Sequence, residues 1–165
     1  MLNILQGRSE VDRVLLSDPH PASGFALVAD MKWDMTTTQD LDCLAIVRRR
    51  DLWTLRDVRS EHLPLLEALQ ARCLREIARR FGVPGSLVRA YLHYQPTFYH
   101  LHVHFTHLRH PASAHLVIDK SIFLSDVIQN LRLCGQYYQR ATLRYPVRVK
   151  TGRKGGKKRL QGKRK

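Results

Sequence analysis

The sequence predicts an α+β domain in which a mainly antiparallel sheet is combined with one long helix and a shorter C-terminal helix. Residues 25–30 and 43–48 are short apolar runs of strand length, and residues 99–106 alternate between apolar and polar side chains. Residues 61–80 instead show the apolar spacing of a helix. Strands that flank one long helix, with another helix after them, favour the α+β class.

The first half of the chain is expected to supply two strands and the long helix. A polar loop, residues 36–40, separates the two strands. The helix is expected from about 61 to 80. Ser60 is a suitable N-cap, Pro64 is tolerated in the first turn and Gly82 is a natural stop. The residues with helical spacing are Leu63, Leu66, Leu69 or Gln70, Cys73 and Ile77.

The second half is expected to contain two strands, a shorter helix and a last strand. Their expected ranges are 87–94, 98–107, 121–133 and 141–145. Ser121 would cap the helix, and loops at 95–97 and 110–114 contain proline. The sheet would therefore be completed by elements on both sides of the second helix.

The charge distribution divides the chain into a domain, residues 1–146, and a basic, disordered tail, residues 147–165. The formal net charge is +14, but the last nineteen residues hold ten Lys or Arg and no Asp or Glu, which leaves about +4 for the rest. Such a segment cannot bury a core. It can bind RNA phosphates, act as a nuclear import signal, or be a solvated tail without a specific partner.

Composition excludes several classes of protein. Hydrophobic residues make up 44% and charged residues 25%, which is typical of a globular domain. No apolar run reaches the roughly 20 residues of a membrane span, and the N-terminus does not resemble a secretory signal. Cys43, Cys73 and Cys134 are scattered, which favours free thiols. We therefore expect an intracellular protein, cytoplasmic or nuclear, with no membrane partner.

The most informative segment is Tyr99-His100-Leu101-His102-Val103-His104-Phe105-Thr106. Because successive side chains of a strand point to opposite faces, the apolar residues would face the core and the three histidines would share the other face. Neutral imidazole is nucleophilic near pH 7, and neighbouring imidazoles can donate hydrogen bonds to phosphate oxygens. The pattern therefore favours a histidine that attacks phosphorus.

Two other interpretations remain open for the three histidines. One is a metal site. The outer two would lie about 13 Å apart on a strand, so all three can hardly share one zinc ion at Zn–N distances of about 2.0–2.1 Å. The other is a polar face whose histidines only form hydrogen bonds.

The same residues resemble the histidine-triad superfamily, whose motif is His-x-His-x-His followed by apolar or small residues. The stretch from Tyr91 to Thr106 is similar, more specifically, to the C-terminal domain of the scavenger mRNA decapping family. The resemblance runs from about Asn3 to Tyr145. Further segments that carry it are Gly24-Phe25, Asp30-Met31-Lys32-Trp33, Ser60 to Leu66, Ala114-His115-Leu116, Tyr138-Gln139-Arg140 and Thr142-Leu143.

The resemblance implies a histidine-triad-like fold and a hydrolase that cleaves the pyrophosphate bridge of 7-methylguanosine-capped dinucleotides or short capped RNA. His102 would be the nucleophile and would carry a covalent nucleotide before 7-methylguanosine monophosphate is released. His100 and His104 would orient it and stabilise the phosphoryl oxygens. Such a reaction needs no metal and no cofactor.

The resemblance also implies the substrate-binding residues. The phosphates would be bound by His93, Thr97 and Lys32. The cap nucleoside would be bound by Glu10 at the guanine edge, Asp30 at the ribose and Met31 against the base. Because methylated guanine is cationic, it favours carboxylates and aromatic faces. Relatives are homodimers, so a homodimer is expected here.

The chain departs from the family pattern at both ends. The stacking tryptophan of the family would precede Asn3, where relatives also carry an N-terminal domain, and neither Trp33 nor Trp53 occupies that position. Either a partner or another aromatic residue would supply the stacking, or methyl selectivity would be weak. After Tyr145 the basic tail replaces the usual ending.

Two alternative functions follow from the same residues. One is a histidine-triad hydrolase of dinucleoside polyphosphates or phosphoramidates, which would treat methylated and unmethylated guanine alike. The other is a non-catalytic, truncated relative that binds RNA or caps through its basic tail, with affinity that depends on salt.

Overall fold

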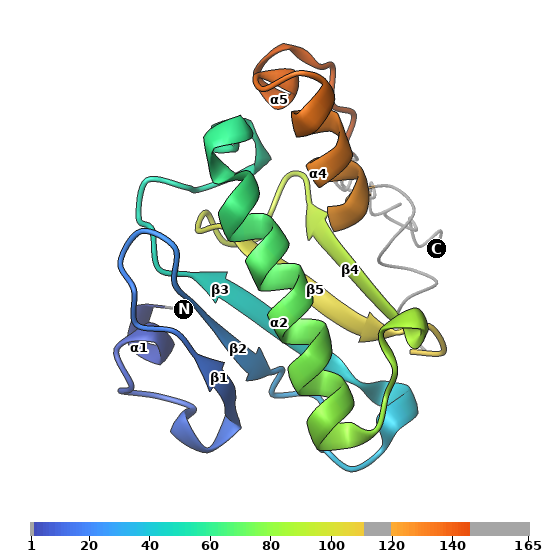
Figure 1. The fold of residues 1–165 in the computed structure, drawn as a ribbon. Helices are drawn as coiled ribbons and strands as arrows, with labels where there is room; N and C mark the ends of the chain where they lie inside the picture. Colours follow the sequence, from blue (N-terminus) through green and yellow to red (C-terminus); the bar gives the residue numbers. More distant parts are fainter. Residues whose placement is uncertain (1, 111–119, 146–165) are drawn as a thin grey trace, which may run out of the picture.

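A computed structural model of the 165-residue chain describes residues 2–110 and 120–145. Within these ranges, six strands form one antiparallel sheet in the order β1-β2-β3-β5-β4-β6 (Figure 1). The strands are β1 Val14–Ser17, β2 Phe25–Ala29, β3 Asp42–Val47, β4 Val88–His93, β5 His102–His107 and β6 Ser121–Phe123. The helices are α1 Leu2–Leu5, α2 Leu63–Phe81, α4 Leu124–Leu133 and α5 Tyr137–Arg140. The predicted α+β class is confirmed.

The long helix α2 crosses one face of the sheet (Figure 1). Its buried stripe includes Leu66, Leu69, Cys73 and Ile77, as the spacing predicts. The predicted N-cap is wrong, because Ser60 begins the 3₁₀ turn Ser60–His62 and His62 occupies the cap position. At the other end, Gly82 has a left-handed backbone with φ of 66°, which suits glycine and ends the helix.

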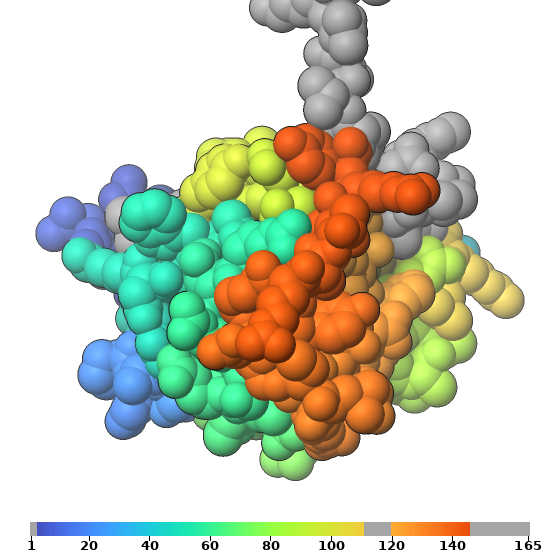
Figure 2. Space-filling model, turned by 90° about the horizontal axis from the view of Figure 1, so that it is seen from above, coloured from blue at the N-terminus to red at the C-terminus, as the bar shows by residue number. Residues whose placement is uncertain are grey.

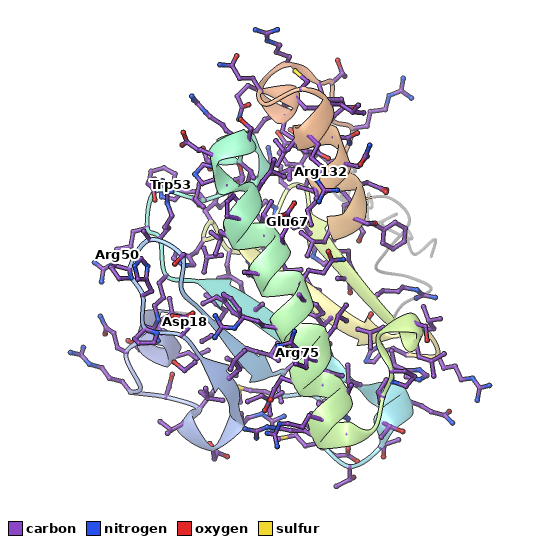
Figure 3. The ribbon with its side chains drawn as sticks, viewed as in Figure 1. Asp18, Arg50, Trp53, Glu67, Arg75 and Arg132 are labelled. Carbon is purple, nitrogen blue, oxygen red and sulfur yellow. The ribbon has the colours of Figure 1, made fainter. Side chains whose placement is uncertain are left out.

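The C-terminal helices pack beside α2. Figure 2 shows this segment, orange to red, adjoining the green α2 at one end of the molecule. Arg132 of α4 and Glu67 of α2 form an ion pair across the groove between the helices, with Nη2 of Arg132 2.6 Å from Oε1 of Glu67 (Figure 3). Arg56 anchors the following segment, because its Nη1 donates to the carbonyl oxygens of Tyr138 and Ala141 at 2.6 and 2.7 Å.

The two faces of the sheet differ in composition. The face under α2 carries the main core, with residues such as Phe25, Leu27, Val103 and Phe105 completely or almost completely buried. The other face has a small apolar cluster of Ala26, Val28 and Ile46, packed by Ile4 and Leu5 of α1 and by Val14 and Leu44. Over β5 and β4, this second face instead carries the histidines His93, His102 and His104.

The strand predicted at 98–107 is wrong at its start. The strand β5 begins at His102, and residues 98–100 are bends that pair with no neighbouring strand. Tyr99 is therefore not a core residue, and 57% of it is exposed. Alternation from Leu101 onward does hold, because Leu101, Val103 and Phe105 are buried in the core.

Other segments also depart from the predictions. Residues 121–123, expected to begin a helix capped by Ser121, form β6 against β4, and Phe123 lies at the N-cap of α4. The strand expected at 141–145 is absent from the described part of the chain, where these residues are irregular. The short elements α1 and β1 had no predicted counterpart.

Some predictions concern properties other than secondary structure. Cys43, Cys73 and Cys134 are free thiols, as expected. Among the described helices, none combines the length and apolarity that crossing a bilayer requires. The basic tail at 147–165 and residues 111–114 of the predicted loop lie outside the described residues.

Candidate active site

The polar part of the second sheet face is made by three neighbouring strands. His104 of β5 lies between Leu44 of β3 and Tyr91 of β4, and His102 lies opposite Ile46. His102 and His104 therefore share a face, as their spacing predicts, whereas Val103 between them enters the core.

His102 is held in one orientation by a hydrogen bond to the backbone. Its Nδ1 lies 2.7 Å from the carbonyl oxygen of His100. Because a carbonyl can only accept, Nδ1 must carry the proton, and in the neutral ring the lone pair is then on Nε2. The residue is 7% exposed, and burial lowers the pKa of its imidazole. His102 is therefore a neutral base with its nucleophilic nitrogen fixed in direction.

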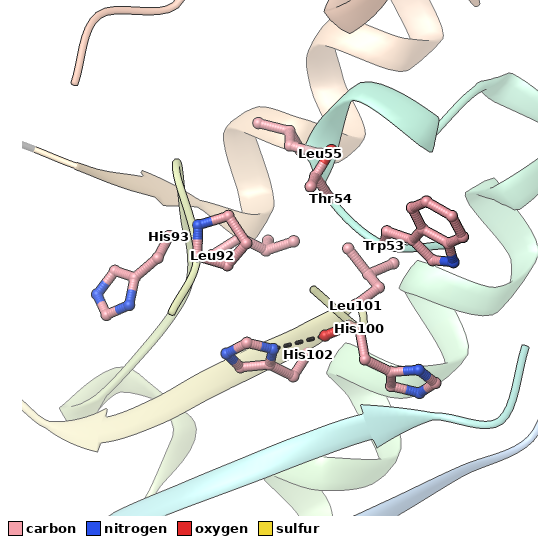
Figure 4. Close-up of a pocket in the computed structure, with 9 residues that line it drawn as sticks. Trp53, Thr54, Leu55, Leu92, His93, His100, Leu101 and His102 are labelled. Carbon is pink, nitrogen blue, oxygen red and sulfur yellow. Dashed lines mark hydrogen bonds between the residues drawn. The ribbon is translucent and has the colours of Figure 1, made fainter. Parts of the chain in front are cut away.

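His100 is absent from the lining of the pocket in front of His102 and His104. It precedes β5, and its Nε2 donates a 2.7 Å hydrogen bond to the carbonyl oxygen of Val47 at the end of β3. In Figure 4 the His102 ring extends toward His93, whereas the His100 ring points to the opposite side, below Trp53. The expectation that all three imidazoles share one face is therefore wrong. His100 orients His102 through its backbone oxygen.

His93 and His104 form the other half of the imidazole cluster. Their ring centroids are 4.4 Å apart, and the His104 ring also stacks on Tyr91 with centroids 5.1 Å apart. Neither Nε2 atom has a hydrogen-bond partner among the described residues, although both atoms are buried. Burial is the main cause that lowers the pKa of His93 to about 4 and that of His104 to about 2. Both rings are therefore neutral near pH 7.

A pocket of about 310 Å³ opens in front of these rings. Such a volume is at the lower end of the range for small-molecule sites. Six residues expected to form the site line it together: Asp30, Lys32, His93, Thr97, His102 and His104. The pocket thus brings His102 together with two other histidines, a lysine, a threonine and a carboxylate.

Arg13 fixes the loop that carries Asp30 and Lys32. Its guanidinium donates to the carbonyl oxygens of Ala29 at 3.1 Å, Asp30 at 2.5 Å and Trp33 at 2.6 Å. Three carbonyl oxygens around one rigid donor group leave the loop little freedom. The position of this pocket edge therefore depends on a side chain that does not line the pocket.

Glu10 and Met31 are not brought into the pocket. Glu10 has a left-handed backbone with φ of 55° just before the 3₁₀ turn Val11–Arg13, and it is absent from the pocket lining. Met31 lies between two lining residues, but its side chain is 71% exposed and does not line the pocket either. These two expected cap-binding residues therefore lie outside the lining.

Sequence reasoning missed five lining residues, namely Asp42, Leu44, Tyr91, Phe98 and Lys120. For two of them the signal was present: Asp42 and Leu44 occupy alternate positions of a strand, so both point to the same face. Lys120 gave no such signal, because it lies between two elements. Phe98 is 62% exposed at the pocket edge.

The pocket has the groups that phosphoryl transfer requires. A neutral, oriented imidazole can serve as a nucleophile, while buried imidazoles and the ammonium group of Lys120 can provide donors and positive charge for phosphate oxygens. Within the described ranges, no three His, Cys, Asp or Glu side chains are grouped to hold a metal ion.

Comparison with known proteins points to the same region. Residues 1–117 match the family described as scavenger mRNA decapping enzyme C-term binding. The chain is 42% identical over 149 residues to the m7GpppX diphosphatase of Ascaris suum, covering 88% of this chain and 48% of that protein. Against the Rattus norvegicus enzyme of the same name it is 42% identical over 147 residues, covering 89% and 44%.

A more distant relative agrees with these two. The m7GpppX diphosphatase of Schizosaccharomyces pombe is 38% identical over 130 residues, which cover 79% of this chain and 43% of that protein. The chain thus spans about half the length of the curated relatives it matches. The family match covers well over half of the chain, including the whole imidazole cluster. The chain therefore belongs to the scavenger mRNA decapping enzyme family, in its C-terminal, histidine-triad part.

Proposed function

We propose that this chain hydrolyses the pyrophosphate bridge of 7-methylguanosine-capped dinucleotides or short capped RNA. The observation that carries the proposal is the state of His102, whose Nδ1 is bound to the His100 carbonyl so that Nε2 is free to attack. The relatives named m7GpppX diphosphatase support the substrate class.

In the first step, Nε2 of His102 attacks the phosphorus next to 7-methylguanosine. The new P–N bond replaces the P–O bond to the bridging oxygen, which leaves with its electron pair as part of the nucleoside diphosphate. The His102 ring becomes cationic as it forms the bond. The carbonyl oxygen of His100, 2.7 Å from Nδ1, stabilises that positive charge.

In the second step, water attacks the same phosphorus from the side that the diphosphate has left. The P–N bond breaks, its electron pair returns to Nε2, and 7-methylguanosine monophosphate is released while one proton of the water passes to solvent. The phosphoryl oxygens are stabilised in both steps by His93, His104 and Lys120, which line the pocket.

The test is turnover of a capped dinucleotide, followed by separation of the products. The wild-type chain is expected to release 7-methylguanosine monophosphate, and His102→Asn is expected to lower the rate about 10³-fold or more. His20→Asn, a substitution of an exposed histidine outside the pocket, is the matched control and should leave the rate unchanged. Turnover by His102→Asn at the wild-type rate would contradict the proposal.

A second measurement separates the alternative hydrolase. A histidine-triad enzyme for dinucleoside polyphosphates would cleave methylated and unmethylated substrates at similar rates. A covalent adduct on the 99–106 peptide, found by mass after rapid quenching, would support the nucleotidyl-histidine intermediate for either substrate.

Three accessory properties are part of the same proposal. We expect a homodimer, which light scattering can test. We also expect the tail, residues 147–165, to bind RNA phosphates, so that its removal lowers the salt dependence of RNA binding. Location in the cytoplasm or nucleus can be followed with and without the tail.

A further inference from the structure

Asp42 is a buried carboxyl group at the end of the pocket opposite the nucleophile. It begins β3 and lies on the same face as Leu44, and across the sheet it pairs with Thr106 of β5. His102 and Thr106 are four residues apart on β5, a separation of about 13 Å along a strand. Both residues line the same pocket, so a nucleotide that lies along it with its phosphate at His102 would place its nucleoside near Asp42.

Asp42 has an unused hydrogen-bonding atom. Its Oδ1 is buried and has no partner among the described residues. Buried polar atoms are nearly always paired in folded proteins, so an unpaired oxygen in a pocket lining indicates a position where a ligand can donate.

The charges around Asp42 come from three directions. Asp30 and Lys32 lie on the loop after β2, and Asp30 and Asp42 are joined by a 2.8 Å backbone hydrogen bond from the Asp30 N–H. On β5 the pocket presents His104, and on β4 it presents Tyr91. Arg89, beyond Tyr91, donates its Nη2 to the carbonyl oxygen of Leu108. Lys32 is thus the cation that faces Asp42 most directly.

We propose that Asp42 makes the nucleoside end of the pocket selective for a positively charged base, such as 7-methylguanine. This inference rests on the proposed function and names the residue that determines its substrate preference. A cation placed near this carboxyl favours its ionised form, so the two charges stabilise one another in a partly buried site. A neutral guanine of the same shape cannot do this.

The ionisation behaviour of Asp42 fits such a role. Burial, with the neighbouring Asp30, raises the pKa of its carboxyl to about 7. Near neutral pH the group is consequently divided between its two forms. Binding of a cationic base would shift it toward the carboxylate through charge attraction, which a neutral base does not provide.

The experiment measures binding of 7-methylguanosine monophosphate and guanosine monophosphate by calorimetry to the full 165-residue chain. The wild type is expected to prefer the methylated nucleotide, and Asp42→Asn is expected to reduce that preference about fivefold or more. Asp42→Glu, which keeps the charge, should retain most of it. Asp40→Asn is the matched control, because Asp40 lies two residues away and outside the pocket lining.

The outcomes distinguish this inference from the proposed function. Both ligands are products or product analogues, so the measurement requires no hydrolysis. An unchanged preference in Asp42→Asn overturns the inference, as does an equal loss for both nucleotides, which would indicate a structural role. If Asp42→Asn does not fold, two other results overturn the inference. One is a wild-type chain that binds both nucleotides equally, and the other is an Asp42→Glu variant that has lost the preference for the methylated nucleotide. A chain that shows the expected preference without cleaving capped dinucleotides would overturn only the proposed hydrolysis.

Discussion

The two faces of the central strand β5 obey different physical rules. Val103 and Phe105 point under α2, where both are completely buried among apolar side chains. His102 and His104 point the other way, toward a pocket in which buried nitrogen and oxygen atoms lack partners. One face therefore supplies stability. The other face lowers the stability of the fold, because it buries polar atoms without partners, and it keeps reactive groups available, as functional sites commonly do.

Truncating two adjacent residues of β5, one on each face, should change stability by very different amounts. Phe105→Ala removes a fully buried ring and should lower the free energy of unfolding by about 3–5 kcal/mol. His104→Ala should lower it by less than about 1 kcal/mol, because it also removes a buried nitrogen that has no partner. Urea denaturation of both variants measures the difference.

Activity should show the reverse order. The His104 variant should lose most of its turnover, while Phe105→Ala should keep turnover below its unfolding transition. Equal unfolding costs for the two variants would contradict the division between the faces.

The same strand shows how far sequence reasoning reaches. Alternation correctly assigns Val103 and Phe105 to the core and His102 and His104 to the pocket. It fails at Tyr99 and His100, since the pattern continues while the chain bends. Nothing in the periodicity reveals that the Leu101 N–H is taken by the carbonyl oxygen of Leu52 rather than by a neighbouring strand.

Elements that depend on distant partners were also hard to predict. The long helix carries its own signal in its apolar spacing, so it was found to within about two residues at its start. Residues 121–123 form β6 only because the edge of β4 accepts them. Residues 141–145 form no strand, and Arg56 already holds the carbonyl oxygen of Ala141.

The pocket was predictable where a motif marked it and not where strand pairing assembled it. The histidine pattern identified His102 and His104, and the resemblance added Asp30, Lys32, His93 and Thr97. Asp42 and Lys120 reach the same pocket from separate elements. Their positions depend on the register of the sheet and on the chain after residue 119, which local patterns do not determine.

On the polar face, replacing the buried Asp42 carboxyl group should raise stability. In the folded chain the pKa of Asp42 is raised to about 7, above its ordinary value near 4 in the unfolded chain. The unfolded state therefore releases the proton first, and stability falls as pH rises from 4 to 7. Asp42→Asn should be more stable than wild type by about 1–2 kcal/mol above pH 7.

Thermal unfolding at several pH values measures this gain. The difference between the two proteins should be near zero at pH 4, grow up to pH 7 and then stay constant. A difference independent of pH would mean that the carboxyl group is not protonated in the folded chain.

The third prediction concerns the support of the pocket edge. Arg13→Lys keeps the positive charge but cannot bind three carbonyl oxygens in the same rigid geometry. The loop with Asp30 and Lys32 should then be less ordered. Binding of 7-methylguanosine monophosphate is expected to weaken about fivefold, close to 1 kcal/mol, as measured by calorimetry. Arg8→Lys, at an exposed position, is the control and should bind normally. Equal affinities for Arg13→Lys and wild type would show that the loop needs no such support.

The reaction rate should respond only weakly to pH if the polar face keeps its imidazoles neutral. Protonation of Nε2 would abolish attack by His102, but burial lowers the pKa of this ring, as it does for His93 and His104. The neutral forms therefore persist below the ordinary midpoint near 6.5. Single-turnover rates at saturating capped dinucleotide should change less than about twofold between pH 8 and 6.5, with the acidic loss at lower pH. A midpoint of the pH–rate profile at 6.5 or above would mean that water reaches these rings as freely as it reaches a surface histidine. The two faces of β5 would then differ in side-chain chemistry and not in how far they exclude water.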